Sequence, residues 1–313
     1  MEYSKNRVSE HATISCDFGV SFSIKQSRDF KIDPIDTLKF LIYTVEFRRF
    51  RLMSYWNEHE AVPGRYNFDE LDQQINLIKN VGGEISLCLG ARQPRWPESH
   101  WPKWALKLPR AERYERLYKY IKIVVERYKD ESSITSYQLE NEALNRSFGT
   151  NGDFNRMRLR DELKIIKKID PTKPVIMSTS NTWGIPLCRP IPDAFGFTFY
   201  QTQFEKGLYT KNKLPYRWWH ARSILIKIIT GRRSFIHELQ AEPWGPKAIW
   251  EMTTEEQDKS MDSKQLKTNI HLAKKTKLLP IDLWGGEWWY WRHLQGDDDI
   301  YKTVIKHLSS DEV

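Results

Sequence analysis

The chain has 313 residues, of which 40% are hydrophobic and 13% aromatic, so it can bury a large core and is not a disordered polypeptide. Its 49 Lys and Arg against 41 Asp and Glu leave a formal charge of +8, which is spread along the sequence. Without a recognisable nucleic-acid-binding module, this excess does not predict nucleic-acid binding. Three cysteines without a Cys-x-x-Cys spacing argue against a disulfide framework and a zinc site, and no metal or other cofactor is expected.

The first eight residues contain no apolar stretch of the signal-peptide kind, and no apolar run approaches the roughly 20 residues of a membrane span. These features lead us to expect a cytoplasmic protein with reduced thiols. Cys16 and Cys88 fall within predicted strands, where a small buried thiol is the usual role.

Short apolar segments with the composition of β-strands recur along the whole chain. In order they are residues 12–20, 47–54, 84–89, 134–139, 174–179, 194–200, 234–238 and 281–284.

Segments with helical periodicity lie between these strands. They are residues 35–45, the stretch from a capping-box-like start at 67–70 to Gly82, and residues 114–128, 157–169, 218–229, 254–277 and 300–308. The Pro-rich connection after the fifth strand leaves a full fifth helix doubtful.

Eight strands in alternation with nearly eight helices predict a parallel sheet closed into a single (β/α)₈ barrel, with residues 1–313 as one catalytic domain. A doubly wound open sheet is the alternative. It usually has a glycine-rich phosphate turn after its first strand, and residues 17–22 lack the G-x-G-x-x-G pattern.

Carboxylate, amide and indole side chains follow the ends of the predicted strands, where barrel enzymes place their active sites. They are Arg51, Tyr55, Trp56, Arg92, Gln93, Trp96, Asn141, Glu142, Asn181, Trp183, Tyr200, Gln201, Glu238, Gln240, Trp284, Glu287, Trp288 and Trp289. Aromatic faces and hydrogen-bonding amides are the groups that hold sugar rings. Glu142 and Glu238 end the fourth and seventh strands, and two facing carboxyls roughly 5–5.5 Å apart are what retaining glycoside hydrolysis requires.

The chain resembles the retaining glycoside hydrolases of clan A, whose acid/base lies on strand four and whose nucleophile lies on strand seven. Residues 141–144 (Asn-Glu-Ala-Leu) are similar to the acid/base motif of family-ten xylanases, and residues 236–239 (Ile-His-Glu-Leu) to their nucleophile strand. Residues 51–56 resemble the strand-two arginine segment of family-five enzymes, and residues 64–70 a helix-two opening of β-galactosidases. The third-strand loop lacks the histidine motif of xylanases and residues 240–246 match none of these families, so no individual family is assigned.

The resemblance implies a β-glycoside hydrolase in which Glu142 is the acid/base and Glu238 the nucleophile. Asn141 would then bind the sugar 2-hydroxyl, while Tyr200 and Arg51 hold Glu238 ionised. Trp284 would form the floor under the sugar, with Trp96 and Gln240 as further binding residues and Trp56 and Trp288 as further aromatic platforms.

Glu242 is the rival nucleophile, and Glu140 is disfavoured because it lies one layer deeper than Glu142. Two other functions stay open. One is a catalytically silent barrel that binds a sugar or a lipid, and the other is a transglycosylase that uses the same glutamates.

The expected partner is a carbohydrate or glycoconjugate, and the expected action is on a short substrate in a blocked cleft. Residues 216–233 combine Trp, aliphatics and cations, as in helices that lie on anionic membranes. The favoured alternative is an ordinary barrel helix, with Leu225, Ile228 and Ile229 inward and Arg222 and Lys227 outward.

Overall fold

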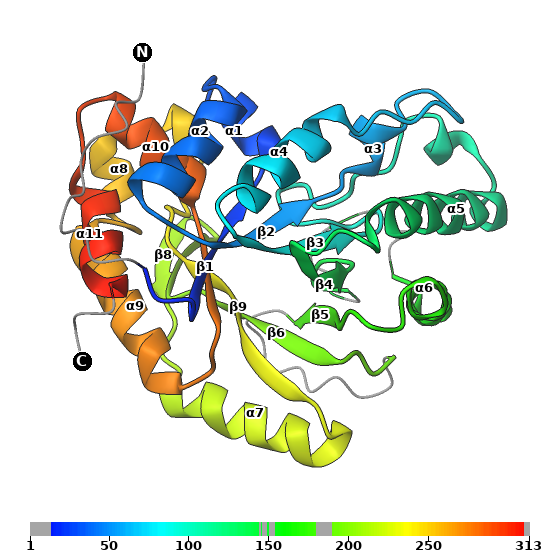
Figure 1. The fold of residues 1–313 in the computed structure, drawn as a ribbon. Helices are drawn as coiled ribbons and strands as arrows, with labels where there is room; N and C mark the ends of the chain where they lie inside the picture. The colour runs from blue at the N-terminus through cyan, green and yellow to red at the C-terminus, as the bar shows by residue number, and fades with distance from the viewer. Residues whose placement is uncertain (1–13, 144, 146–148, 150–153, 180–189, 310–313) are drawn as a thin grey trace.

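The computed structural model of the chain describes residues 14–143, 145, 149, 154–179 and 190–309. Eight parallel strands form a closed barrel in the order β1-β10-β9-β6-β5-β4-β3-β2, with helices around the outside (Figure 1). The barrel strands are β1 (Phe18–Phe22), β2 (Arg49–Met53), β3 (Glu84–Leu89), β4 (Ile134–Leu139), β5 (Val175–Thr179), β6 (Ala194–Phe199), β9 (Arg233–Gln240) and β10 (Ile281–Trp284). The predicted (β/α)₈ fold is therefore confirmed.

Most helices lie between barrel strands along the chain, and α10 and α11 follow the last strand. They are α1 (Ile24–Asp29), α2 (Pro34–Lys39), α3 (Trp56–His59), α4 (Asp69–Lys79), α5 (Arg110–Tyr128), α6 (Arg156–Ile169), α7 (Tyr216–Thr230), α8 (Thr254–Asp258), α9 (Ser263–Thr276), α10 (Gly286–Leu294) and α11 (Asp299–Leu308). Short turns of other helix types complete the set at η1 (Phe40–Thr44), η2 (Ala105–Lys107) and η3 (Ile249–Glu251).

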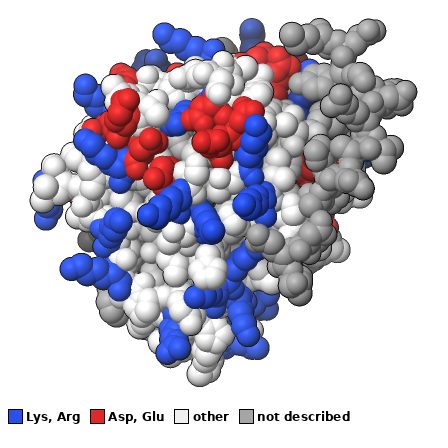
Figure 2. Space-filling view, turned by 90° about the vertical axis from the view of Figure 1, so that its left-hand side faces the viewer, with Lys and Arg blue, Asp and Glu red and all other residues white. Residues whose placement is uncertain are grey.

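Charged side chains are unevenly distributed on the face shown in Figure 2. Asp and Glu gather in its upper part, whereas Lys and Arg stand among uncharged residues in its lower part. The even spread of charge along the sequence therefore does not carry over to this surface.

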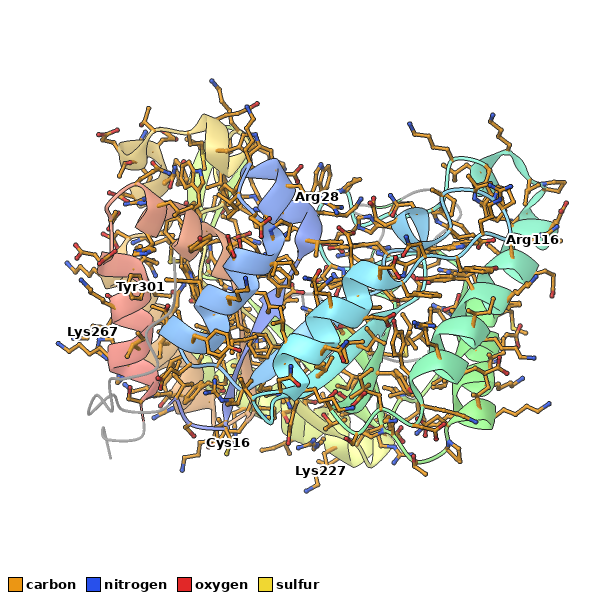
Figure 3. All side chains as sticks on the ribbon, turned by 45° about the horizontal axis from the view of Figure 1, so that its top comes forward. Cys16, Arg28, Arg116, Lys227, Lys267 and Tyr301 are labelled. Carbon is orange, nitrogen blue, oxygen red and sulfur yellow. The ribbon has the colours of Figure 1, made fainter. Side chains whose placement is uncertain are left out.

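Several features of the structure differ from the sequence-based expectation. The helix expected over residues 254–277 is interrupted between α8 and α9, and residues 286–294 form α10. A hairpin of β7 (Thr202–Glu205) and β8 (Leu208–Lys211), with its turn at Lys206 and Gly207, follows β6. Cys16 precedes β1 and is exposed instead of lying in a strand (Figure 3).

Helix α7 also differs, because its inward and outward residues are not those that its periodicity suggested. Leu225, Ile228 and Ile229 are exposed, whereas Arg222 is buried. The Arg222 guanidinium lies 4.5 Å from the centroid of the Phe197 ring, and its Nη2 donates to Thr179 Oγ1 at 3.2 Å. A buried cation with an aromatic face and a hydroxyl to contact thus occupies the position expected for an aliphatic residue.

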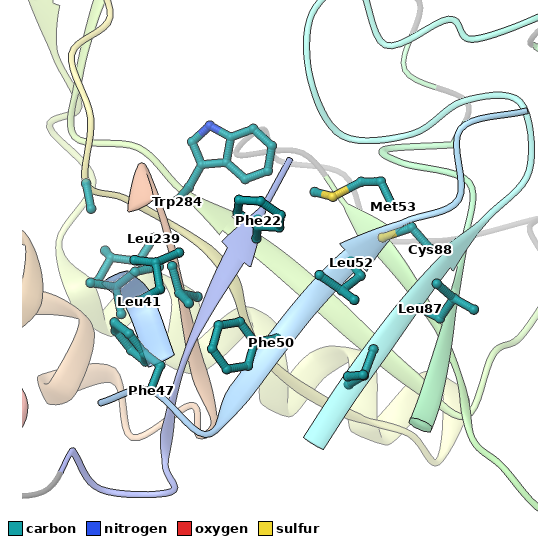
Figure 4. Packing of buried hydrophobic residues seen from close by; sticks show 14 of the residues in the cluster. Phe22, Leu41, Phe47, Phe50, Leu52, Met53, Leu87, Cys88, Leu239 and Trp284 are labelled. Carbon is teal, nitrogen blue, oxygen red and sulfur yellow. The ribbon is translucent and has the colours of Figure 1, made fainter. Parts of the chain in front are cut away.

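The barrel wall is continuous with the apolar layer beneath the helices. Phe22 on β1, Leu52 on β2 and Leu87 on β3 are fully buried and belong to the same cluster as Leu41 and Phe47 (Figure 4). Parallel strands covered on both faces form near-continuous apolar runs, which is why the sequence indicated most of them. The exception is β1, which begins at Phe18 in the described residues, whereas a strand over residues 12–20 was expected. This rigid wall carries the polar residues at the strand ends.

Candidate active site

Arg51 on β2 is the centre of the polar network at the rim. Its guanidinium is fully buried and joins three strands, with Nε donating to Gln138 Oε1 at 2.6 Å and Nη2 donating to Asn141 Oδ1 at 2.9 Å. Nη1 donates to Glu238 Oε1 at 2.6 Å. Burial alone would lower the pKa of Arg51, but the neighbouring Glu238 carboxylate raises it, so the guanidinium stays protonated.

Glu238 on β9 presents its second carboxylate oxygen differently. Tyr200 donates to Oε2 at 3.5 Å, which is a long contact. Glu238 is only 6% exposed, so its carboxyl is largely shielded from bulk water. Oε1 is therefore anchored by a cation while Oε2 is held loosely.

Glu142 lies just beyond the end of β4, where the chain turns sharply. Its φ of 40° is in the left-handed region, and its backbone N–H donates to Ser178 Oγ at 2.7 Å. Such a backbone in a residue other than glycine is a local strain that the surrounding contacts must hold. Asn145 Nδ2 donates to Oε2 at 3.1 Å.

The environment of Glu142 favours its protonated form. Burial raises the pKa of this carboxyl, and the charge of Glu238 raises it further, to about 7. Two carboxyls thus lie within electrostatic reach of each other, and one of them keeps its proton near neutral pH.

Glu98, in the loop after β3, adds a third carboxyl to the same group. It accepts from Asn141 Nδ2 at 2.8 Å. Burial and the charges of Glu142 and Glu238 hold its pKa well above the usual range. Glu98 was not among the residues expected at the rim, because its position depends on the path of the loop.

The loop after β3 has a specific path because of Gly90 and Glu140. Gly90 has a φ of 104°, and a Cβ there would lie 2.5 Å from Glu140 Oε1. Glu140 accepts from the backbone N–H groups of Ala91 and Arg92 at 3.0 and 2.8 Å and pairs with Arg158 at 2.7 Å. Glu140 is therefore a buried structural residue.

Glu242 is held by a second arginine. Arg95 donates to both of its oxygens, at 2.6 and 3.2 Å, and Trp284 Nε1 donates to Oε1 at 2.9 Å. The same guanidinium lies 4.1 Å from the Trp284 ring centroid and 3.3 Å from Glu287 Oε2. The bidentate pair leaves Glu242 less free to react than Glu238.

The expected aromatic and amide binding residues occupy very different environments. Trp284 is 6% exposed and lies between the two arginine clusters, 5.8 Å from Arg51 and 4.1 Å from Arg95. Trp96 is 78% exposed, at the tip of the loop after β3. Gln240 is buried, and its amide binds the backbone of Gln201 and Thr202.

Trp56 and Trp288 are core residues and not sugar platforms. Trp56 has no exposed surface, donates to Glu60 and stacks on Tyr120, and Trp288 is likewise buried and donates to Gln257. Asn181 and Trp183 lie outside the described residues.

No group of three or more His, Cys, Asp or Glu residues with metal-binding geometry is found in the described part of the chain. Among the same residues, no helix is both long and apolar enough to cross a membrane.

No family model and no curated protein matches the sequence. Solved structures do resemble the fold. Xylanase 10B from Thermotoga petrophila in complex with xylobiose superposes with a TM-score of 0.63 at 11% identity, covering 97% of this chain and 98% of that one. GH5_18 from Streptomyces cattleya in complex with GlcNAc gives 0.60 at 11% identity, over 88% and 71%.

A β-galactosidase from the Antarctic haloarchaeon Halorubrum lacusprofundi gives a TM-score of 0.54 at 15% identity, over 85% of this chain and 52% of that one. The chain therefore spans about half the length of that enzyme. It has the barrel fold of these glycoside hydrolases. The expected resemblance to clan A is confirmed at the level of the fold, and the individual family is unassigned.

Proposed function

We propose that the protein is a retaining β-glycoside hydrolase with Glu142 as acid/base and Glu238 as nucleophile. The observation that carries the proposal is the inequivalence of the two carboxyls. Glu238 is paired with the buried Arg51 guanidinium, whereas burial and the Glu238 charge raise the pKa of Glu142 to about 7. A charged and a protonated carboxyl in one site are the two reactants of a double displacement.

In the first step Glu142 gives its proton to the glycosidic oxygen as the bond from that oxygen to the anomeric carbon breaks. Oε2 of Glu238 attacks the same carbon and forms a glycosyl ester. Arg51 already occupies Oε1, so the loosely held Oε2 is the oxygen that reacts.

In the second step the ester has removed the negative charge of Glu238, which is one cause of the raised pKa of Glu142. Glu142, now deprotonated, accepts a proton from water while the water oxygen attacks the anomeric carbon and releases Glu238. The configuration at the anomeric carbon is inverted twice and is therefore retained.

The substrate we propose is a short β-linked carbohydrate or glycoconjugate, with one sugar over Trp284. Glu142, Glu238 and Tyr200 are each less than a tenth exposed, which favours a confined site over an open cleft. Asn141 Nδ2 donates one of its two hydrogens to Glu98, and the other is the donor we assign to a sugar hydroxyl.

The test is a screen of aryl β-glycosides and short oligosaccharides with the wild type and Glu238→Gln, with the anomeric product followed by NMR. Release of the aglycone with retained configuration supports the proposal, and an inverted product contradicts it. A wild type that binds sugars and releases no aglycone supports the silent-barrel alternative. Formation of a longer glycoside at high acceptor concentration supports the transglycosylase.

A further inference from the structure

The outer face of α7, which we define as Ile224, Leu225, Ile228 and Ile229, is apolar. These side chains are 48%, 39%, 75% and 45% exposed. The opposite side of the helix packs inward through Trp219, Arg222 and Ile226. A barrel helix is expected to be polar where it faces solvent, so α7 has its apolar residues on both sides.

Helix α9, which packs beside α7, shows the usual arrangement. Its exposed residues are Lys264, Lys267, Thr268, His271 and Lys275. The apolar character of the outer face is therefore specific to α7 and is not shared by the neighbouring helix α9.

Cations flank the outer face of α7, and the helix itself carries no acidic residue. Residues 216–233 contain no Asp or Glu. Arg217, Lys227, Arg232 and Arg233 are exposed, and within the described part of the chain none of them forms an ion pair. Lys275 of α9 joins them beside Tyr216, with its Nζ 5.9 Å from the ring centroid.

The position of α7 in the molecule leaves this face accessible. In Figure 1 the helix lies along the lower edge of the molecule, and Figure 3 places Lys227 at that edge. The lower part of the surface in Figure 2 carries Lys and Arg and shows no cluster of acids. An apolar strip with cations around it is the pattern of a helix that lies in the headgroup region of an anionic bilayer.

We propose that the protein binds an anionic lipid surface through the outer face of α7. Ile224, Leu225, Ile228 and Ile229 would enter the boundary between headgroups and acyl chains, while the four exposed cations contact lipid phosphates. Each cation near such a surface adds to the electrostatic attraction. Arg217 lies in the first turn of α7 and Lys227 in its last turn, while Arg232 and Arg233 follow the helix at the start of β9.

A second copy of the chain fits this face less well. Two copies related by a twofold axis through α7 would bring Arg217, Lys227, Arg232 and Arg233 of each close to the same cations of the other. Four partly exposed aliphatic side chains also offer only a few hundred Å², against roughly 800 Å² per partner in a stable dimer.

The test is sedimentation of the protein with vesicles of phosphatidylglycerol and phosphatidylcholine in equal parts, and with phosphatidylcholine alone. We expect binding to the mixed vesicles only, and weaker binding as salt is added. Ile228→Glu should weaken binding about tenfold or more, because it places a charge in the apolar strip. Arg232→Gln with Arg233→Gln should also weaken it about tenfold or more.

Leu208→Glu is the matched control, because Leu208 is 69% exposed and lies on β8, away from the outer face of α7. It should bind as the wild type does. The proposal is wrong if the wild type binds neither vesicle or both equally, or if Ile228→Glu binds like the wild type. It is also wrong if sedimentation velocity shows a dimer that Ile228→Glu dissociates.

Discussion

Glu238 and Glu242 are separated by three residues, and each carboxylate is held by a different arginine. Arg51 binds one oxygen of Glu238, whereas Arg95 binds both oxygens of Glu242 and Trp284 adds a third hydrogen bond there. The sequence favours Glu238 as nucleophile over its rival Glu242, and the structure distinguishes the two by their hydrogen bonds. Oε2 of Glu238 accepts the long contact from Tyr200 and is the oxygen that reacts in the proposed mechanism, whereas Glu242 supports the ring of Trp284.

The first prediction separates these roles by substitution. Glu238→Gln should lower kcat by about a thousandfold or more, since the nucleophile is lost. Glu242→Gln removes a charge from the Arg95 cluster and should cost about tenfold or less, mainly in KM. The measurement is hydrolysis of an activated aryl β-glycoside by both variants. Full activity in Glu238→Gln would make Glu242 the nucleophile.

The second prediction concerns the pH dependence of catalysis. Glu142 must be protonated for the first step, and burial together with the Glu238 charge raises its pKa to about 7. The value of kcat/KM should therefore fall above about pH 7 in the wild type. Glu142→Gln should lose this alkaline limb on a substrate whose leaving group needs no proton. A limb that persists in Glu142→Gln would assign the titration to another group.

The same raised pKa has a consequence for stability. The folded protein binds the proton of Glu142 more tightly than the unfolded chain does. The favourable contribution of Glu142 to the free energy of unfolding is therefore complete below about pH 4.5 and is lost as the pH rises through about 7. Glu142→Gln should therefore be more stable than the wild type at pH 8 by about 1–3 kcal/mol. At pH 4 the two proteins should unfold at the same denaturant concentration.

The strand ends could be predicted from sequence because their signals are local. Apolar runs located β3, β4 and β10 residue for residue, and the alternation of strands and helices indicated the barrel. Glu142 and Glu238 follow from that alternation, since parallel strands end at one rim. Arg51 contacts Glu238 for the same reason, because β2 and β9 contribute to the same rim.

The loop residues could not be predicted in this way. Glu98 and Arg95 reach the rim because the loop after β3 takes left-handed backbone angles, with a φ of 104° at Arg95 and 57° at Glu98. No periodic pattern encodes such a path. The predicted orientation of α7 was wrong for a related reason. When apolar residues lie on both sides of a helix, the sequence pattern does not indicate which side faces the barrel.

The third prediction concerns the Arg95 cluster. Arg95→Met leaves Glu242 and Glu287 buried without their cation, which should destabilise the fold by about 3–5 kcal/mol at pH 8. Burial and Glu242 raise the pKa of Glu287 to about 7 against the opposing effect of Arg95, so the variant should hold this proton more tightly still. The loss of stability in this variant should be smaller at pH 5, where Glu287 is protonated.

Arg127→Met is the control for this experiment. Arg127 is 45% exposed and pairs with Asp72 at the surface. Chemical denaturation should show a change of about 1 kcal/mol or less for this variant. A loss of that small size in Arg95→Met would mean that the cluster contributes little to the fold.

The fourth prediction concerns Glu98, which binds Asn141 beside the two proposed catalytic carboxyls. Burial and the charges of Glu142 and Glu238 hold its pKa well above the usual range, so Glu98 should be uncharged when the enzyme works. Gln has the same shape and also accepts from Asn141 Nδ2, so Glu98→Gln should keep kcat/KM within about threefold. Glu98→Ala removes the acceptor and should lower kcat/KM about tenfold, because Asn141 loses a partner that orients its amide.

Steady-state kinetics of both variants on one aryl β-glycoside provide the measurement. A loss of a hundredfold or more in Glu98→Gln would show that the charged carboxylate takes part in the reaction, and the assignment of Glu98 as a neutral orienting residue would be wrong.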